Sequence, residues 1–460
     1  MNRFLLCRRL VTVSSRKSSS GIGSHIIRPV VTTEKRSYRY QPHPMMPYAA
    51  KGPAPAFGRF LTFDHITFIV GNARQAAAHY CVHFGFTPFA YKGLETGSRD
   101  IASHVVKLND IVLEFQSPLK PDHPADLTGH LTKHGDAIKV VAFAVEDIEA
   151  IVQTAKDAGA QVVQDVEEEF EGGGGGSVKT AVFAPFGDTV HKLVERTADF
   201  KGRFMPGYEQ PDLKIHRLLE ALPPAPLLAI DHLVGCQPDA QLEPVVNWYE
   251  RALNFHRFWS VDDSQIHTEY SALRTTVIAN WEETIKMPIV EPAPGLRKSQ
   301  VHEFVEYFGG CGVQHVALRT EDIISGINLV YQLKTNPLIF TSVCFDYFAA
   351  IQILQSRGVE FLKTPPVYYK KIRELLSKSP VTVLEDLEVL EKLNILLDFD
   401  DTGYLLQIFT KPLQDRPTHF LEIIQRRKHQ GFGAGNIKTL FEAVEYEQER
   451  RGNLVTEVKG

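Results

Sequence analysis

The chain has 460 residues, of which 43% are apolar and 23% are charged, and its formal net charge is −5 at pH 7. These values are typical of a soluble globular protein with two or three domains. They give no reason to expect a nucleic-acid partner or an anionic membrane, and no run of about 20 apolar residues predicts a membrane helix. Five scattered cysteines without a CxxC pair favour free thiols over a disulfide framework or a zinc ribbon.

The first segment, residues 1–57, differs from the rest. It is rich in Arg and Ser and has no acidic residue before Glu34, which is the composition of a mitochondrial transit peptide. A disordered tail, or an extension translated from a wrong start, is the alternative, because Met45 and Met46 stand shortly before "GRFLTFDHITF". We therefore expect a cytoplasmic protein whose folded part begins at residue 58, or a mitochondrial one if the segment is a transit peptide.

An internal repeat organises the remainder. The stretches "FDHITFIVGNARQAAAHYCVHFGFTPF", from Phe63, and "IDHLVGCQPDAQLEPVVNWYERALNFHRF", from Ile230, share one pattern. In each, an Asp-His pair opens an apolar strand, and an amphipathic helix with a Tyr near its end follows, at Tyr80 and at Tyr249. The repeat predicts two halves with the same order of elements.

A second pair of similar stretches follows in each half. "GDAIKVVAFAVEDIEAIVQTAKDAGAQVV" parallels "GCGVQHVALRTEDI", which continues as "AIQILQSRGVEFL" after an interruption. Both predict a turn, a strand, a helix with an acidic start, a glycine cap and another strand. With the short alternating strands elsewhere, this favours an α+β fold of mixed sheets curved around a cavity. We predict domains at 58–205 and 230–454, joined by a proline-containing linker at 206–229.

Two segments interrupt the pattern. The glycines of "EFEGGGGGSVKT" match neither GxGxxG nor GxxxxGK[ST], and no helix start follows, so we expect a flexible hairpin loop. Residues 326–349 have no counterpart in the first half and carry β-branched and aromatic residues with an internal Asn-Pro. We interpret them as a loop insertion or as an unspliced intron.

Three polar residues interrupt apolar strands of the second half: His232, His315 and Glu422. Two neutral imidazoles and one carboxylate form the facial triad of non-haem Fe(II) oxygenases, which leaves three coordination positions open. Each residue alone is more often a satisfied buried polar group. However, Val140 stands in the first half where His315 stands in the second, and His65 alone remains there, so we expect a metal only in the second half.

Several long motifs carry a resemblance to a known family. "FHRFWSVDD", "HTEYSALR", "MPIVEPAPGLRKSQ", "GGCGVQHVALRTEDI", "GYLLQIFTKPLQDRPTHFLEIIQR" and "HQGFGAGNIKTLFEA" resemble 4-hydroxyphenylpyruvate dioxygenase, and the likeness runs from about Gly58 to Leu454. The resemblance implies two vicinal-oxygen-chelate domains of paired βαβββ modules. It also implies a cavity in the C-terminal domain that a C-terminal helix closes.

The resemblance implies roles for individual residues. His232, His315 and Glu422 would bind one Fe(II) per subunit. The catalytic polar residues of the pocket would be Gln300, Gln314 and Gln407. Substrate-binding positions would be Thr275, Val290, Phe409, Phe420, Phe432, Asn436 and Ile437. The implied reaction converts 4-hydroxyphenylpyruvate and O₂ to homogentisate and CO₂ in tyrosine and phenylalanine catabolism, in a homodimer or homotetramer.

Two positions depart from the family pattern. Val290 stands where we expect Asn, and Ile437 stands where we expect Phe. A sibling branch, 4-hydroxymandelate synthase, hydroxylates the benzylic carbon of the same substrate, and it resembles this chain in having an aliphatic residue at the Ile437 position. One hypothesis is therefore that product shifts toward 4-hydroxymandelate, and another is that the pocket tolerates both changes. A third is an inactive paralogue that acts as a binding module.

Overall fold

The computed structural model describes residues 51–56, 58–211, 224–261, 272–295, 297–324, 330–332, 342–344 and 350–452. The predicted extension at 1–57 and the predicted insertion at 326–349 therefore fall largely outside the described residues, as does much of the predicted linker. Within the insertion, the backbones of β14 (Val330–Gln332) and β15 (Ser342–Cys344) form a separate antiparallel pair.

The first half forms one eight-stranded mixed sheet with the order β2-β3-β4-β1-β5-β8-β7-β6. Its strands are β1 (Arg59–Ile69), β2 (Thr87–Lys92), β3 (Ile101–Leu108), β4 (Ile111–Pro118), β5 (Ala137–Glu146), β6 (Val162–Phe170), β7 (Ser177–Phe186) and β8 (Thr189–Arg196). Its helices are α1 (Ala73–Phe84), the short 3₁₀ helix η1 (Leu94–Thr96), α2 (Ala125–His134) and α3 (Ile148–Asp157).

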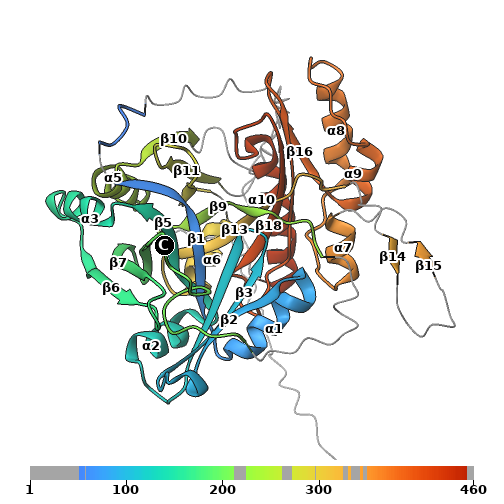
Figure 1. Cartoon of the computed structure of the whole chain (residues 1–460). Helices are drawn as coiled ribbons and strands as arrows, with labels where there is room; N and C mark the ends of the chain where they lie inside the picture. The colour runs from blue at the N-terminus through green and yellow to red at the C-terminus, as the bar shows by residue number, and fades with distance from the viewer. Residues whose placement is uncertain are drawn as a thin grey trace, which may run out of the picture. The chain divides into compact units, whose positions relative to one another are not determined.

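The second half repeats this arrangement with the order β10-β11-β12-β9-β13-β18-β17-β16. Its strands are β9 (Ala229–Cys236), β10 (His256–Val261), β11 (Ala272–Ala279), β12 (Lys286–Ala293), β13 (Gly312–Arg319), β16 (Leu396–Phe399), β17 (Tyr404–Phe409) and β18 (Phe420–Arg427). Its helices are α5 (Leu242–Leu253), α6 (Gln300–Phe308), α7 (Ala350–Ser356), α8 (Pro366–Leu376), α9 (Leu387–Leu393) and α10 (Ala434–Arg451) (Figure 1).

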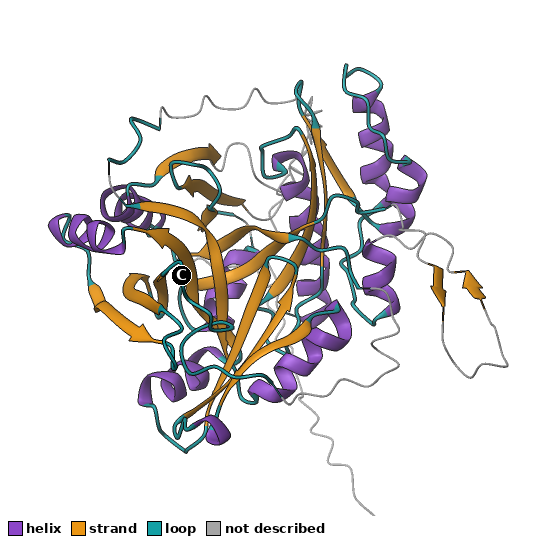
Figure 2. Cartoon of the chain, viewed as in Figure 1, coloured by secondary structure: helices purple, strands orange, loops and turns teal. Residues whose placement is uncertain are grey.

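The element order confirms the predicted α+β fold with paired βαβββ modules. The order β1-α1-β2-β3-β4 is followed by β5-α3-β6-β7-β8, and the second half begins in the same way with β9-α5-β10-β11-β12 (Figure 1). Figure 2 shows the helices lying around the strands. The two central strand pairs share one register, because His65 pairs with Ala142 and His232 pairs with Ala317. This register places Val140 at the position of His315, as the repeat predicted.

The glycine-rich stretch is a hairpin, as expected. β6 and β7 are antiparallel, and Phe170 pairs with Ser177 across the turn. Three of the glycines between them have a positive φ, which residues with a Cβ adopt only at a cost. The turn therefore uses its glycines for backbone geometry.

One expected strand is wrong. The stretch "VEFL" after Gly358 forms only an isolated bridge, from Phe361 to Thr410, in place of the predicted strand. Proline occurs at positions 365 and 366, and it cannot donate to a strand ladder. The chain instead forms α8 and α9, which the sequence did not predict, and β16 takes the sheet-edge position that β6 has in the first half.

The interior of the first sheet is filled by the segment that follows β8. Phe204 and Met205 are buried against Ala142, and Tyr208 packs against the same cluster. The ring of His65 lies 4.7 Å from that of Phe204. In the described part of the first half, these side chains therefore pack beside His65, where the second half has a pocket beside His232.

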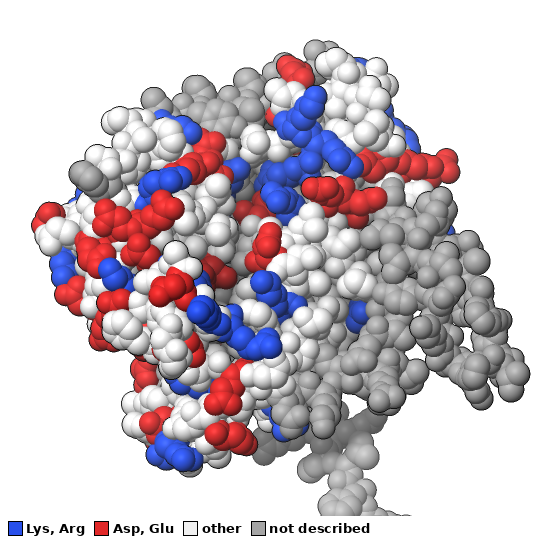
Figure 3. All heavy atoms as spheres, viewed as in Figure 1, with Lys and Arg blue, Asp and Glu red and all other residues white. Residues whose placement is uncertain are grey.

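The surface carries both signs of charge. On the face shown in Figure 3, Lys and Arg side chains are mixed with Asp and Glu side chains. Among the helices of the described residues, none combines the length and the apolar character that a membrane crossing requires.

Candidate metal centre

Three neighbouring strands of the second sheet bring His232, His315 and Glu422 together. His232 is on β9 and Glu422 is on β18, and both pair with Ala317 of β13, which lies between them. His315 is two residues before Ala317, so it points to the same face of the sheet. The small side chain of Ala317 leaves the space between the three polar groups open.

The three side chains are close enough to share one ion. Glu422 Oε2 lies 3.3 Å from His232 Nε2 and 3.5 Å from His315 Nε2. One ligand atom from each residue lies within 4.8 Å of the others, and all three residues are buried. Because a metal–ligand bond in such a site is about 2.0–2.2 Å long, ligand atoms of one ion lie about 3–4 Å apart. The residues therefore fit a single bound metal.

The other nitrogen of each imidazole is held by the protein. His232 Nδ1 lies 2.7 Å from Asp231 Oδ1, and Arg426 donates to both oxygens of the same carboxylate at 2.7 and 2.9 Å. His315 Nδ1 donates to Gln314 Oε1 at 3.1 Å. Because both acceptors bind the Nδ1–H tautomer, the lone pairs of the two Nε2 atoms point at Glu422.

The charges of the triad are suited to a cation. Burial opposes ionisation of Glu422, but the two imidazoles outweigh it and lower the pKa of Glu422 to about 2. Burial also disfavours protonation of His315 and lowers its pKa. For His232 burial acts in the same direction, but the carboxylates of Glu422 and Asp231 outweigh it and raise the pKa. One fixed negative charge thus faces two imidazoles in a site closed to water.

A pocket with an empty volume of about 580 Å³ opens beside the triad. Its predicted members are the three triad residues, Thr275, Val290, Gln300, Gln314, Gln407, Phe409 and Phe432. The three glutamines and the Thr275 hydroxyl are the uncharged polar groups, and Thr275 Oγ1 is buried without a hydrogen-bond partner. The pocket therefore combines apolar walls, a few polar groups and a metal-binding end, which is the usual make-up of a small-molecule site.

Three predicted pocket residues lie elsewhere or are described only in part. Phe420 does not line the pocket but stacks on His315, with ring centroids 4.7 Å apart and ring planes at 19°. Asn436 is fully buried and contacts the pocket through Gln407 Oε1, to which it donates at 3.4 Å. The backbone of Ile437 belongs to α10, and its side chain lies outside the described part of the structure.

The N-terminus of α10 lies against the pocket. Gly433 precedes the helix with a φ of +72°, and a Cβ at this residue would lie 2.2 Å from Gln407 Oε1. Tyr368 Oη of α8 is 2.6 Å from Asn436 Oδ1. The positive φ therefore favours glycine at 433, and Asn436 of α10, itself held by Tyr368, contacts Gln407, in agreement with the predicted C-terminal helix over the cavity.

Six further lining residues were not predicted: Val234, Trp259, Leu273, Pro288, Val301 and Leu440. The alternation of side chains along a strand could have identified three of them. Val234 lies two residues after His232, Leu273 two before Thr275, and Pro288 two before Val290, so each shares a face with a predicted residue. Asp231 directly precedes His232 in the sequence and could have been proposed as its partner, but Arg426, which pairs with Asp231, is 195 positions away.

The first half has an equivalent aspartate–arginine pair on its histidine, although it lacks the triad. Asp64 contacts His65 Nδ1 at 2.6 Å, and both Nη atoms of Arg196 donate to the Asp64 carboxylate. By register, Lys192 stands where Glu422 stands in the second half, since it pairs with Ala142. Among the described residues, the positions that the triad occupies in the second half hold one histidine, a valine and a lysine in the first half, which do not form its ligand set.

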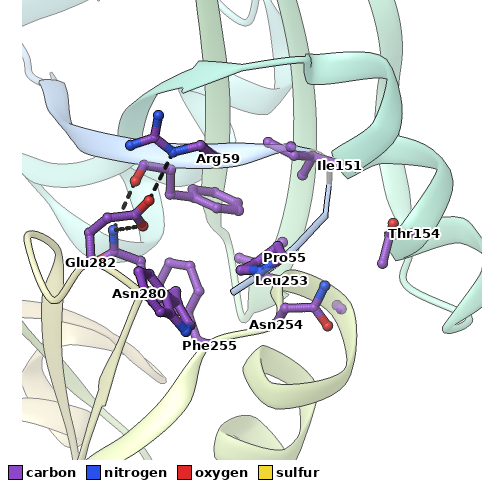
Figure 4. Close-up of a pocket in the computed structure, with 13 residues that line it drawn as sticks. Pro55, Arg59, Ile151, Thr154, Leu253, Asn254, Phe255, Asn280 and Glu282 are labelled. Carbon is purple, nitrogen blue, oxygen red and sulfur yellow. Dashed lines mark hydrogen bonds and ion pairs between the residues drawn. The ribbon is translucent and has the colours of Figure 1, made fainter. Parts of the chain in front are cut away.

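A second hollow lies at the junction of β1, α3, α5 and the β11–β12 turn, with an empty volume of about 400 Å³ (Figure 4). Its charged groups are already paired, because Arg59 Nε donates to Glu282 Oε1 at 3.0 Å. Asn280 Nδ2 donates to the Phe60 carbonyl at 2.8 Å. This hollow offers no ligand set like that of the triad.

Comparison with known proteins agrees with this geometry. Residues 64–178 and 229–334 each match the glyoxalase/bleomycin resistance protein/dioxygenase superfamily. The chain is 53% identical over 412 residues to 4-hydroxyphenylpyruvate dioxygenase from Xenopus tropicalis, covering 89% of this chain and 97% of the relative. It is 48% identical over 392 residues to the enzyme of that name from Dictyostelium discoideum, covering 85% and 99%.

A solved structure shares the fold. It is a triple mutant of 4-hydroxymandelate synthase from Streptomyces coelicolor, which is 28% identical and superimposes with a TM-score of 0.67. The match covers 85% of this chain and 99% of the other. The predicted pair of vicinal-oxygen-chelate domains is thereby confirmed.

Proposed function

The chain belongs to the 4-hydroxyphenylpyruvate dioxygenase family, and we propose that it converts 4-hydroxyphenylpyruvate and O₂ to homogentisate and CO₂ with one Fe(II) per subunit. The observation that carries the proposal is the buried convergence of His232, His315 and Glu422 at one end of a pocket. Two imidazoles and one carboxylate are the ligand set of non-haem Fe(II) oxygenases.

His232, His315 and Glu422 would hold the metal through two Nε2 atoms and one carboxylate. Bound there, Fe(II) would supply open coordination positions for the 2-oxo acid group and for O₂, and it would activate the O₂, which is the oxidant of the reaction. The protein's part is to keep these ligands ready. Asp231 and Gln314 orient the two imidazoles, and the low pKa of Glu422 keeps its carboxylate ionised at neutral pH.

The pocket walls would place the substrate. Phe409 and Phe432 provide aromatic faces next to the triad, with the ring of Phe432 5.1 Å from that of His232. Such walls bind a phenyl ring and exclude water from the reacting carbon atoms. The amides of the three glutamines supply donors and acceptors for the carboxylate, keto and phenol oxygens of the substrate.

Thr275 would take over part of the role of the missing amide at Val290. The two residues pair across β11 and β12, so both reach the same wall of the pocket. The Thr275 hydroxyl is buried and has no hydrogen-bond partner among the described residues, and a buried hydroxyl gains free energy when a ligand oxygen pairs with it. We infer that it hydrogen-bonds the substrate.

Ring hydroxylation is favoured over the benzylic alternative. The relatives at 45–53% identity bear the dioxygenase name, whereas the synthase structure is 28% identical. The intact triad and pocket also favour an enzyme over an inactive binding module. The subunit arrangement, a homodimer or homotetramer, and the compartment, cytoplasmic or mitochondrial, stay predictions that light scattering and fractionation would test.

Product analysis tests the proposal. The purified chain is incubated with Fe(II), ascorbate and 4-hydroxyphenylpyruvate in air, and the products are separated, identified and quantified by mass spectrometry. Homogentisate in amounts equal to the O₂ consumed is expected. Release of 4-hydroxymandelate would contradict ring hydroxylation, and absence of substrate-dependent O₂ uptake in iron-loaded protein would contradict the enzyme assignment.

A further inference from the structure

Two histidines and one aspartate meet at a place remote from the triad in sequence and sheet. His130 and His134 lie one turn apart on α2, and Asp188 lies in the turn between β7 and β8. One ring nitrogen of each histidine and one carboxylate oxygen lie within 4.8 Å of one another. Histidines four residues apart on one helix project from the same face, which is a common arrangement for two ligands of one zinc ion.

His134 has its two ring nitrogens fixed by different partners. Its Nδ1 lies 2.6 Å from the carbonyl oxygen of Phe308, which can only accept a hydrogen bond, so Nδ1 carries the proton. Its Nε2 lies 2.8 Å from Asp188 Oδ2, which is also an acceptor when ionised. A neutral imidazole would place a lone pair against this carboxylate. A cation bound by both atoms would turn this contact into a favourable one.

His130 has no partner at either nitrogen. The residue is about 2% exposed, and neither Nδ1 nor Nε2 has a hydrogen-bond partner among the described residues. Nδ1 is 4.0 Å from Asp188 Oδ2, which is too long for a hydrogen bond. A buried imidazole without partners is costly, and a metal ion between it and Asp188 would satisfy it.

We propose that His130, His134 and Asp188 form a second, structural binding site for a divalent metal of the Zn²⁺ class. Imidazole and carboxylate ligands suit Zn²⁺, which takes four ligands in structural and open sites alike. The carbonyl of Phe308 supplies the support that metal-binding histidines usually have at their other nitrogen. The Asp188 side chain is 39% exposed, which provides an entry path and room for water as the fourth ligand.

Lys133 competes for the carboxylate. Its Nζ lies 3.6 Å from Asp188 Oδ2, and its side chain is 51% exposed, so it can swing into solvent when a metal binds. An ammonium group close to a divalent ion weakens binding. Replacing Lys133 with Met should therefore tighten Zn²⁺ binding about tenfold, from the Coulomb repulsion of a single charge at about 6 Å in a water-like medium.

The site would join the two halves of the chain. α2 packs against α6, and Phe308 is the last residue of α6, while Gln300, its first residue, lines the pocket beside the triad. An ion on His134 would reinforce the bond to the Phe308 carbonyl and so fix the C-terminal end of α6. We infer that Zn²⁺ raises the melting temperature and that it does not take part in the oxidation.

Zn²⁺ binding by full-length variants tests the proposal. Equilibrium dialysis with ZnCl₂ and elemental analysis are carried out on Glu422→Ala, which disables the triad, and on this variant with His130→Ala or Asp188→Asn added. Each added change should remove one equivalent of Zn²⁺, and Zn²⁺ should raise the melting temperature only where the three residues are intact. Asp188 lies in a partly exposed turn, so its variant keeps the fold if His130→Ala does not.

A matched control is available on α1. His79 and His83 are also four residues apart, and His83 Nδ1 contacts the carbonyl oxygen of Arg357 at 2.6 Å, but no carboxylate joins them in a ligand cluster of the described residues. His79→Ala should leave Zn²⁺ binding unchanged. Equal Zn²⁺ content with and without His130 and Asp188, or an equal loss caused by His79→Ala, would overturn the second site and leave the triad untouched.

Discussion

The Asp231 carboxylate offers a prediction with an internal control. It accepts the Nδ1 hydrogen of His232 at 2.7 Å and two hydrogen bonds from Arg426, and the pair is nearly enclosed, with side-chain exposures of 8% and 13%. Asp64 makes the same contacts with His65 and Arg196 in the first half. Asp231→Asn and Asp64→Asn therefore remove the same interaction from two sites, only one of which holds the triad.

The two variants should lose similar stability. Removing one partner of a buried ion pair costs about 3–5 kcal/mol, so Asp231→Asn should lower the free energy of unfolding by about that amount. Asp64→Asn should cost somewhat less, because the side chain of Arg196 is 29% exposed and water replaces part of the loss. Both carboxyls have lowered pKa values, despite burial, so this stability is present at neutral pH and is lost as the pH falls below the unfolded pKa of 3.8.

Metal affinity should separate the variants. A carboxylate on the second nitrogen raises the basicity of a metal-binding imidazole, and its loss weakens metal binding about 10–100-fold. We expect this weakening for Asp231→Asn and none for Asp64→Asn, measured as the Fe(II) dissociation constant by anaerobic chelator competition beside urea unfolding. Equal Fe(II) affinity in the two variants would refute the view that Asp231 acts on the metal through His232.

Three further changes have defined outcomes. Thr275→Val should stabilise the substrate-free protein by about 1–3 kcal/mol, because Oγ1 is buried without a hydrogen-bond partner among the described residues. The same change should raise the KM for 4-hydroxyphenylpyruvate, and a lower KM would contradict the role of Thr275 as a hydrogen-bond donor to the substrate. Burial raises the pKa of Asp398 to about 6, so ionisation of this carboxyl destabilises the fold as the pH rises from 4 to above 6. Asp398→Asn should therefore raise the free energy of unfolding by about 3 kcal/mol at pH 8 and leave it unchanged at pH 3. A gain that does not depend on pH, measured by urea unfolding, would disprove this. Phe204→Ala should cost about 3 kcal/mol by opening a cavity beside His65, with iron content unchanged; loss of iron would show that the first half supports the centre.

Sequence patterns predicted the triad because its three polar residues interrupt strands that are otherwise apolar. Polar residues in apolar strands have no packing reason, and the repeat supplied a comparison in which Val140 takes the place of His315. The repeat likewise predicted that Val140 and His315 take equivalent positions, and the register of the two sheets confirms it. The same alternation could have predicted Val234, which lies two positions after His232 and therefore points to the same face of its strand.

Features set by distant contacts could not be predicted in this way. Arg426 pairs with Asp231 across 195 positions, and no local pattern links them. The edge strand β16 replaces the expected strand after Gly358 because two further helices intervene, and the choice between two edge strands is made by tertiary packing. Phe204 and Met205 fill the first sheet from a segment that composition alone marks as a loop.

Iron content tests the central claim most directly. Asp188→Asn, which lacks the proposed second site, and the double variant Asp188→Asn with Glu422→Ala are loaded with Fe(II) without oxygen, dialysed, and analysed for iron per chain. We predict one iron per chain in the first and essentially none in the double variant, because two imidazoles without the carboxylate leave the charge of the ion unneutralised. Equal iron in both proteins would contradict the assignment of His232, His315 and Glu422 as the metal ligands.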